Sequence, residues 1–449
     1  MASSSLVLDL AAAQERVLRL LRAPFVAPET DLHHIARDVL ARREEVLACL
    51  QDQPTPCYVF DPVGFANALA EFRQTFDRQL PRHHSFFAVK SNPHPRVLEA
   101  AVRHGFGLDV SSGRELSQAL SFPDCPIVFS GPAKSQDDHE RALAHSDRVT
   151  VHLDSFRELR NLAATAEQRR KPIRAGVRVS PQGHGAWSKF GIPLSDLPRF
   201  LRLAWESPWL QLEGVQFHLS WNRDPRPYVD SLSALAQVLT TLEPAERARL
   251  RFIDIGGGFR PHRTEGYFPS DHPQGSLLAT AADHFDEVCE FTAPHFVKDS
   301  VPLSAYAEAI GEAVRQRIAP LGDFAIYTEP GRIVATFAMH IALRVVDRKS
   351  DDLVIVDGGI HMVGWERYLQ IYHPVVNLTH PAERELAVRI GGSLCDCEDV
   401  FGRTCYASQI DEGDILLIPY QGAYSYTSAQ NFIRDIPPVI SLPAPSSDH

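Results

Sequence analysis

Short apolar runs and amphipathic segments alternate along most of the chain. The apolar runs have the length of strands and most end in a polar or glycine residue, whereas the segments between them repeat apolar residues at helical spacing. Strands are predicted over residues 55–61, 85–90, 106–112, 126–131, 148–155, 173–180, 212–220, 250–258 and 324–331. About eight strand–helix units of this kind are typical of a (β/α)8 barrel. A doubly wound open sheet has the same alternation and is the main alternative.

The pattern changes after Ile333. Strand-like runs then follow one another, broken by Gly, Pro and Asp, with few helical stretches. This pattern predicts a mostly β domain over residues 336–449, with the barrel at 55–335 and an N-terminal helical extension at 1–54 that packs with the β domain. A segment rich in Pro, Gly and His, within about 260–300, is expected to be an insertion that forms a surface loop or lid.

Composition narrows the class of protein. A chain of 449 residues is too long for one ordinary core, and 44% hydrophobic with 22% charged residues is typical of a globular protein. A formal net charge of −11 argues against a nucleic-acid or anionic-membrane surface. The seven cysteines are scattered without a C-x-x-C pair, which indicates reduced thiols. The amphipathic N-terminus resembles no signal peptide, and no run is long enough to span a bilayer, so a cytoplasmic protein is expected.

Chemically versatile residues follow several of the predicted strands. Lys90 ends the apolar run 86–89, and His218 ends another strand. The triple glycine 256–258 follows a third strand, and Glu329 with Arg332 follows the last. In a barrel these strand ends meet on one rim. Each feature alone also occurs as an ordinary turn or a structural histidine, so only their joint placement indicates a functional site.

The combination fits one cofactor better than others. A lysine at the apolar entrance of a barrel is expected to have a lowered pKa, and its neutral amine can form a Schiff base. Glycine N–H groups and Arg332 would bind a phosphate. A carboxylate such as Glu329 would hold a proton on a pyridine nitrogen, and His218 would stack on the ring. Pyridoxal 5'-phosphate carries the aldehyde, the phosphate and the ring that these groups require.

The sequence resembles the fold-type III pyridoxal-phosphate decarboxylases, the ornithine, diaminopimelate and arginine decarboxylase group with an alanine-racemase-like barrel. The motifs occur in the family's order between about residues 55 and 435. They are "FAVKSNPHPRVL", "GFGLDVSSGREL", "RVSPQGHGAWSKFGI", "GVQFH", "DIGGGF", "EPGR", "GSLCDCED" and "GAYSY". The resemblance implies a barrel that binds pyridoxal phosphate, a C-terminal β domain and a homodimer with shared active sites.

The resemblance also implies roles for individual residues. Lys90 would hold the cofactor covalently, with His218 on the ring face and Glu329 at the ring nitrogen. The partner subunit would supply Cys395 as the proton donor after carbon dioxide leaves, and Asp396 would face the substrate. The remaining residues that would contact the cofactor are Asp109, Glu115, Arg178, Ser220, Gly257, Gly258, Gly331, Arg332 and Tyr424.

Three departures from the family pattern concern specificity. The family's phosphate-binding serine is displaced by one position to Ser220, next to the bulky Trp221. The position of the distal arginine of diaminopimelate enzymes falls on Trp365, and Arg367 follows two residues later. With Tyr372 these residues are the candidates for the distal substrate pocket. Finally, the interval between GGGF and EPGR is long, which is where the insertion lies.

These observations predict a decarboxylase that removes the α-carboxylate of an amino acid or of an amino-acid conjugate. Diaminopimelate, ornithine, lysine and siderophore precursors are the substrate types considered. A racemase on the same barrel is one alternative, although Cys395 in "CDCED" favours decarboxylation. A catalytically inactive homologue that binds a partner protein is another. A metal site in C-x-C is not expected, because no histidine pair accompanies it.

Overall fold

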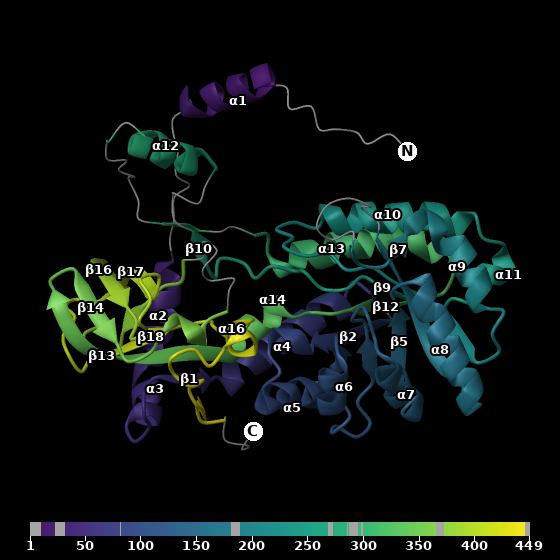
Figure 1. The fold of residues 1–449 in the computed structure, drawn as a ribbon, viewed down its shortest axis with the longest axis horizontal. Coiled ribbons are helices and arrows are strands. Elements are labelled where there is room, and N and C mark those ends of the chain that lie inside the picture. The colour runs from purple at the N-terminus through teal and green to yellow at the C-terminus, as the bar shows by residue number, and fades with distance from the viewer. Residues whose placement is uncertain are drawn as a thin grey trace.

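The structure is a computed structural model that describes residues 10–22, 32–80, 82–180, 189–267, 273–284, 286, 295–297, 300–364 and 372–444. These residues form two large sheets, a parallel barrel and a mostly antiparallel sheet, which lie side by side in Figure 1. Residues 365–371, which include Trp365 and Arg367, lie outside the described part of the chain. Among the described residues, no helix is both long and apolar enough to cross a bilayer.

The barrel is built from eight of the predicted strands. They are β2 (His83–Ala88), β3 (Gly107–Val110), β4 (Ile127–Phe129), β5 (Val149–Leu153), β6 (Ile173–Ser180), β8 (Leu210–Gln216), β9 (Phe252–Asp254) and β12 (Ala325–Thr328). Each pairs in parallel with its neighbours, and the pairs β5–β6 and β12–β2 close the ring. A two-residue strand, β7 (Ile192–Pro193), pairs in parallel with the end of β6 and is not part of the ring. The closed parallel ring confirms the predicted barrel over the open sheet.

Helices cover the outside of the barrel, as the ribbon in Figure 1 shows. They are α4 (Pro62–Asp77), α5 (Pro95–Arg103), α6 (Gly113–Ala119), α7 (Gln136–Ala144), α8 (Phe156–Arg169), α9 (Leu197–Ala204), α10 (Arg226–Thr240), α11 (Pro244–Arg247), α13 (Leu303–Ala313) and the short α14 (Arg332–Ala335). Three begin directly after a serine, Ser112, Ser135 or Ser155, whose hydroxyl accepts a backbone N–H of the first turn. Such N-caps fix where a strand-to-helix loop ends.

The second sheet contains strands from both sides of the barrel sequence. Its members are β1 (Cys57–Phe60), β13 (Met339–Ser350), β14 (Leu353–Val356), β15 (Val376–Asn377), β16 (Glu385–Gly391), β17 (Val400–Tyr406), β18 (Ile415–Ile418) and β19 (Val439–Ser441). β1 lies between β13 and β19. The predicted strand 55–61 therefore belongs to this sheet and not to the barrel, because its pairing partners come from the C-terminal part of the chain.

The N-terminal helices have two different neighbours. α2 (His33–Ala41) and α3 (Arg43–Leu50) bury apolar residues in a core shared with β1, β13 and β18. α1 (Leu10–Arg22) instead contacts α12 (Pro273–His284), and the two helices lie together above the body of the molecule in Figure 1. α12 belongs to the expected insertion, whose short strands β10 (Gly266–Tyr267) and β11 (Phe296–Val297) pair with each other.

Candidate active site

A cavity of about 500 Å³ lies at the carboxyl ends of the barrel strands. This is the rim where (β/α)8 barrels carry their functional residues. Most of the predicted cofactor residues line it: Lys90, Arg178, His218, Ser220, Gly258, Glu329, Gly331, Arg332 and Tyr424. The fold thus brings together groups that come from six different segments of the chain.

Lys90 lies in the short helical turn η1 (Val89–Ser91) directly after β2. Its Nζ donates a hydrogen bond to Asp109 Oδ2 over 2.8 Å. Asp109 is fully buried on the adjacent strand β3, and its other oxygen accepts the hydroxyl of Ser130. The pair is a charge-assisted contact that fixes the amine at the mouth of the cavity.

The expected lowering of the pKa of Lys90 is wrong for the free amine. Burial does act to lower this pKa, but the charges of Asp109, Glu329 and Tyr424 and the hydrogen bond to Asp109 raise it above its ordinary value. The apolar residues before Lys90 would by themselves lower the pKa of its amine. The carboxylate that reverses the sign comes from the neighbouring strand.

His218 and Glu329 meet in the interior of the cavity. His218 Nδ1 lies 3.1 Å from Glu329 Oε2 and 3.2 Å from the N–H of Gly257. The Gln216 side chain donates to both oxygens of Glu329, at 3.2 and 3.4 Å. Burial and the charges of Lys90 and Arg178 lower the pKa of His218 well below its ordinary value. The imidazole is therefore neutral.

The triple glycine forms a turn that only glycine fits. Gly258 has φ +88°, and a Cβ there would lie 2.0 Å from the carbonyl oxygen of Leu219. At Gly257 a Cβ would lie 2.2 Å from the carbonyl oxygen of Glu329. The missing side chains let the backbones after β8, β9 and β12 approach one another closely. Gly258 lines the cavity together with Arg332.

Arg332 opens α14 and lies near two aromatic rings. Its guanidinium carbon lies 5.1 Å from the ring of Trp221 and 4.9 Å from that of Tyr424. Burial lowers the pKa of Arg332, although the nearby Tyr424 raises it. Tyr424 comes from the segment after β18 and is anchored by its N–H, which donates to Ser91 O over 2.8 Å. The second sheet thus contributes directly to the cavity of its own chain.

Arg178 is a second buried guanidinium, on β6. It lies over the ring of Phe190 at 4.3 Å and donates weakly to the carbonyl of Ser130 over 3.5 Å. Burial lowers the pKa of Arg178, while Glu329, Asp154 and Asp109 raise it. This residue supplies positive charge beside the acidic groups of the barrel interior.

Some predicted residues do not line this cavity. Cys395 and Asp396 are exposed in the loop between β16 and β17. Tyr372 is buried elsewhere, where its hydroxyl contacts Glu385 and Thr404 and its ring stacks on His295. Trp221 does line the cavity, in a left-handed conformation (φ +61°) and 44% exposed.

The sequence analysis missed several polar residues inside the barrel. Gln216 on β8 contacts Glu329, as described above, and Asp254 ends β9 with His152 of β5 beside it. A signal is visible for His152 and Asp254, because each is an ionisable residue in a short, fully buried and largely apolar strand. For Gln216 the signal is weaker, because β8 also contains Gln211 and Glu213. Arg260, which follows the triple glycine and also lines the cavity, was missed as well. Its place next to the glycine motif could have singled it out.

Comparisons with known proteins agree with this geometry. Residues 67–336 match the family described as "Pyridoxal-dependent decarboxylase, pyridoxal binding domain". A diaminopimelate decarboxylase from Methanothermobacter thermautotrophicus is 26% identical over 394 residues, covering 84% of each chain. A 2-[(L-alanin-3-ylcarbamoyl)methyl]-2-hydroxybutanedioate decarboxylase from Staphylococcus aureus is 25% identical, over 84% of this chain and 91% of the relative. The solved diaminopimelate decarboxylase of Helicobacter pylori complexed with L-lysine matches with a TM-score of 0.70 at 23% identity, over 89% of this chain and 94% of that one.

The chain therefore belongs to the pyridoxal-dependent decarboxylases, and its fold is the alanine-racemase-like barrel with a separate β domain. Its cofactor is pyridoxal phosphate. The cavity fits this group, since it holds an amine for the aldehyde and a carboxylate for the ring nitrogen. It also has a side-chain-free glycine turn next to an arginine, which suits a phosphate.

Proposed function

We propose that this protein removes the α-carboxylate of an amino acid or an amino-acid conjugate, of the diaminopimelate, ornithine, lysine or siderophore-precursor type. The observation that carries the proposal is that Lys90, His218, Glu329 and Arg332 all line the same cavity. The names of the relatives, one of which decarboxylates a carbamoyl-linked conjugate, support this range of substrates. When bound, pyridoxal phosphate supplies the electron sink for the electron pair left by departing carbon dioxide.

Lys90 and Asp109 are assigned to the attachment of the cofactor. Lys90 would hold the cofactor through its aldehyde, with the aldehyde oxygen leaving as water, and its amine must first lose a proton to act as a nucleophile. Asp109 lies 2.8 Å from the amine and is placed to accept that proton. The Ser130 hydroxyl keeps the carboxylate in this orientation. These contacts explain why the Lys90 amine is protonated without the cofactor and already lies next to Asp109, the group that would accept its proton.

His218, Glu329 and Gln216 are assigned to the ring. The neutral imidazole of His218 would contact the ring face without placing a second charge beside it. The Glu329 carboxylate, held by the Gln216 amide, holds a proton at the ring nitrogen. A buried carboxylate is suited to this role because a low-dielectric site strengthens its attraction for the protonated ring.

The phosphate is assigned to Gly257, Gly258, Gly331, Arg332 and Tyr424, with Ser220 and Arg178 as further groups at the cavity wall. Backbone N–H groups and a guanidinium are the usual donors to a phosphate. The rings of Trp221 and Tyr424 restrict the position of the Arg332 guanidinium, which lines the cavity together with Gly258.

Cys395 and Asp396 are assigned to a site shared between two subunits. Their exposure in the single chain supports a role at an interface, since they do not reach the cavity of their own chain. We assign Cys395 the proton donation that follows loss of carbon dioxide. Trp365, Arg367 and Tyr372 remain the proposed distal substrate group, although Tyr372 does not line the cavity of its own chain. The cysteines that the structure describes are free, which supports the proposed cytoplasmic location.

The substrate is tested with a panel that includes diaminopimelate, ornithine, lysine, arginine, carboxyspermidines and hydroxybutanedioate conjugates. Each is incubated with the purified protein and pyridoxal phosphate, and mass spectrometry follows the loss of carbon dioxide. One member should lose carbon dioxide in the wild type and be unchanged with Lys90→Ala. Exchange of the α-hydrogen with no loss of carbon dioxide would instead indicate a racemase. Cofactor binding without either reaction would contradict the proposal.

A further inference from the structure

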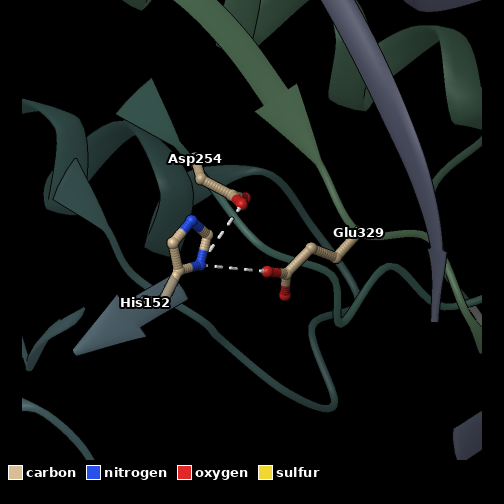
Figure 2. Close-up of side chains that lie close together, drawn as sticks. All are labelled: His152, Asp254 and Glu329. Atoms are coloured by element: carbon tan, nitrogen blue, oxygen red, sulfur yellow. Dashed lines mark ion pairs between the residues drawn. The ribbon is translucent and has the colours of Figure 1, made fainter. Parts of the chain in front are cut away.

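Beneath the cavity, three buried groups converge on one point of the barrel interior. Figure 2 shows His152, Asp254 and Glu329 pointing toward one another from β5, β9 and the end of β12. His152 Nδ1 lies 3.9 Å from Asp254 Oδ2 and 4.0 Å from Glu329 Oε1. The side chains of all three are fully shielded from solvent. Only Glu329 has a role in the reaction described above.

The barrel makes room for this cluster. A Cβ on Gly176 of β6 would lie 2.9 Å from His152 Cδ2, and a Cβ on Gly214 of β8 would lie 1.9 Å from the ring of Phe252. The His152 ring packs against Phe252, with centroids 5.8 Å apart. Two glycines in adjacent strands therefore leave space for a histidine and a phenylalanine where interior side chains would otherwise fill the barrel.

The hydrogen bonds of the cluster are incomplete if both acids are ionised. Asp254 Oδ1 accepts the N–H of Gly256 over 2.8 Å, but Oδ2 finds no donor among the described residues. The facing atoms of the three groups all lie within 4.8 Å of one another. Two carboxylates this close and this deeply buried repel each other when both are ionised, which favours a proton on one of them. A proton on one of them removes the repulsion and provides the missing donor.

We propose that Asp254 and Glu329 form one carboxyl pair that holds a single proton, and that Asp254 carries it. Asp254 is then a positioning residue, which donates its O–H to Glu329 and leaves Glu329 as the anion that faces the cofactor's ring nitrogen. His152 is the neutral side chain that packs beside both carboxylates and shields them from solvent. This inference rests on the proposed role of Glu329.

The charges around the pair favour this distribution. Burial, the charge of Glu329 and a hydrogen bond to Glu329 raise the pKa of Asp254 well above its ordinary value, although the Gly256 N–H acts against them. Asp109 raises it further. Burial lowers the pKa of His152 to about 4, with Lys134 and Arg178 acting in the same direction and Glu329 and Asp109 against it. The histidine thus cannot supply the proton near neutral pH.

The same residue types could ligate a metal ion, but two observations favour a proton. Lys134 and Arg178 already contribute positive charge at the cluster, which would repel a cation. A metal bound to Glu329 would also neutralise the carboxylate that faces the ring nitrogen. Metal analysis of the purified holoenzyme should therefore find no stoichiometric ion. An ion that is present in the wild type and lost in His152→Ala would overturn the inference.

Infrared spectroscopy of the full-length holoenzyme tests the proton directly. At about pH 7, where an ordinary aspartic acid is ionised, the wild type should show the C=O stretch of a protonated carboxyl group. Carbon-13 labelling of aspartate should shift this band, which separates it from protonated glutamates. The difference spectrum against Asp254→Asn should contain the band, and His152→Phe should keep it. A wild type without the band, or its survival in Asp254→Asn, would overturn the inference, as would its loss in His152→Phe.

Asp61→Asn is the matched control for this measurement. Asp61 is also buried, and burial acts to raise its pKa, but hydrogen bonds to His340 and Arg42 lower it well below the ordinary value. Its substitution should leave the band unchanged. The infrared result does not depend on turnover, so a missing band with normal decarboxylation would defeat this inference alone. A present band without decarboxylation would defeat only the proposed function.

Rescue by a conservative variant tests the positioning role. Asp254→Asn keeps the shape of the side chain and an N–H donor toward Glu329, whereas Asp254→Ala removes both. Asp254→Ala should lower kcat by about tenfold or more relative to Asp254→Asn, and it should alter the absorption spectrum of the bound cofactor. Equal loss in both variants with an unaltered spectrum would mean that Asp254 acts through packing alone, and would overturn the inference.

Discussion

At the scale of single residues, the site depends on charges contributed by neighbouring strands. Lys90 follows an apolar strand, yet Asp109 on the next strand keeps its amine protonated. His218 lies in the same cavity and is kept neutral by burial and by positive neighbours. Opposite protonation states thus occur within one cavity, because each group responds to its immediate contacts and not to the average polarity of the site.

Lys90 should be the residue that bonds to the cofactor. Borohydride reduction of the holoenzyme followed by peptide mapping should locate the pyridoxyl group on Lys90. Lys90→Ala should lower kcat by several orders of magnitude, since the amine acts both in attachment and in product release. Lys349→Ala, at an exposed lysine of β13, serves as the control and should keep both the label and the rate. A label on any other lysine would contradict the assignment.

Glu329→Gln should separate turnover from cofactor binding. The amide keeps the size of the side chain but cannot hold a proton on the ring nitrogen, so kcat should fall by at least about tenfold. The dissociation constant for pyridoxal phosphate should change little, because the phosphate and the lysine remain. The two constants are obtained from steady-state kinetics and from an absorbance titration. An unchanged kcat would mean that another group acts at the ring nitrogen.

At the scale of elements, strand ends and turns bring the site together. The eight barrel strands were predictable because each is short and contains apolar residues, and most are followed by a helical pattern. The prediction assigned strand 57–60 to the wrong sheet. Its neighbours β13 and β19 are distant in sequence, and no local sequence pattern predicts those pairings. Similarly, the polar positions His152 and Asp254 are visible in the sequence, but their contact depends on the closure of the barrel.

The glycine turn after β9 gives a prediction at this scale. Gly258→Ala should strain a backbone with φ +88° and also push the new Cβ against Leu219 O. The free energy of unfolding should fall by more than the roughly 1–2 kcal/mol of left-handed strain alone. The affinity for pyridoxal phosphate should fall by about tenfold or more, because the turn moves away from the phosphate.

Gly413→Ala is the matched control. Gly413 has a similar φ of +93°, but a Cβ there meets no atom within 4 Å. In this variant the free energy of unfolding should fall only by the cost of left-handed strain, and the affinity for the cofactor should stay at the wild-type value. Denaturant unfolding and cofactor titration of both variants make the comparison. Equal cofactor affinity in the two variants would contradict a role for the Gly258 turn in binding.

At the scale of the whole molecule, the position of Cys395 predicts a shared active site. Lys90→Ala and Cys395→Ala should each be nearly inactive alone. In a mixed dimer with shared sites, one site carries both defects and the other carries neither. Random reassortment gives about half mixed dimers, so mixing should restore activity to about a quarter of the wild type. No recovery on mixing, with dimer exchange verified by mass spectrometry, would contradict the shared site.

The placement of β1 between β13 and β19 has a consequence for how the protein is made. A ribosome releases β1 at residues 57–60 before any barrel strand, but its second neighbour, at residues 439–441, leaves last. The barrel strands are all available once residue 328 has emerged, whereas β1 must wait for partners from the far end of the chain. Pairing of this kind is slow because the chain loses the entropy of closing a long loop before the strands gain their contacts. During synthesis, Tyr424 too is among the last site residues to arrive, so the nascent barrel forms before its cofactor site is complete.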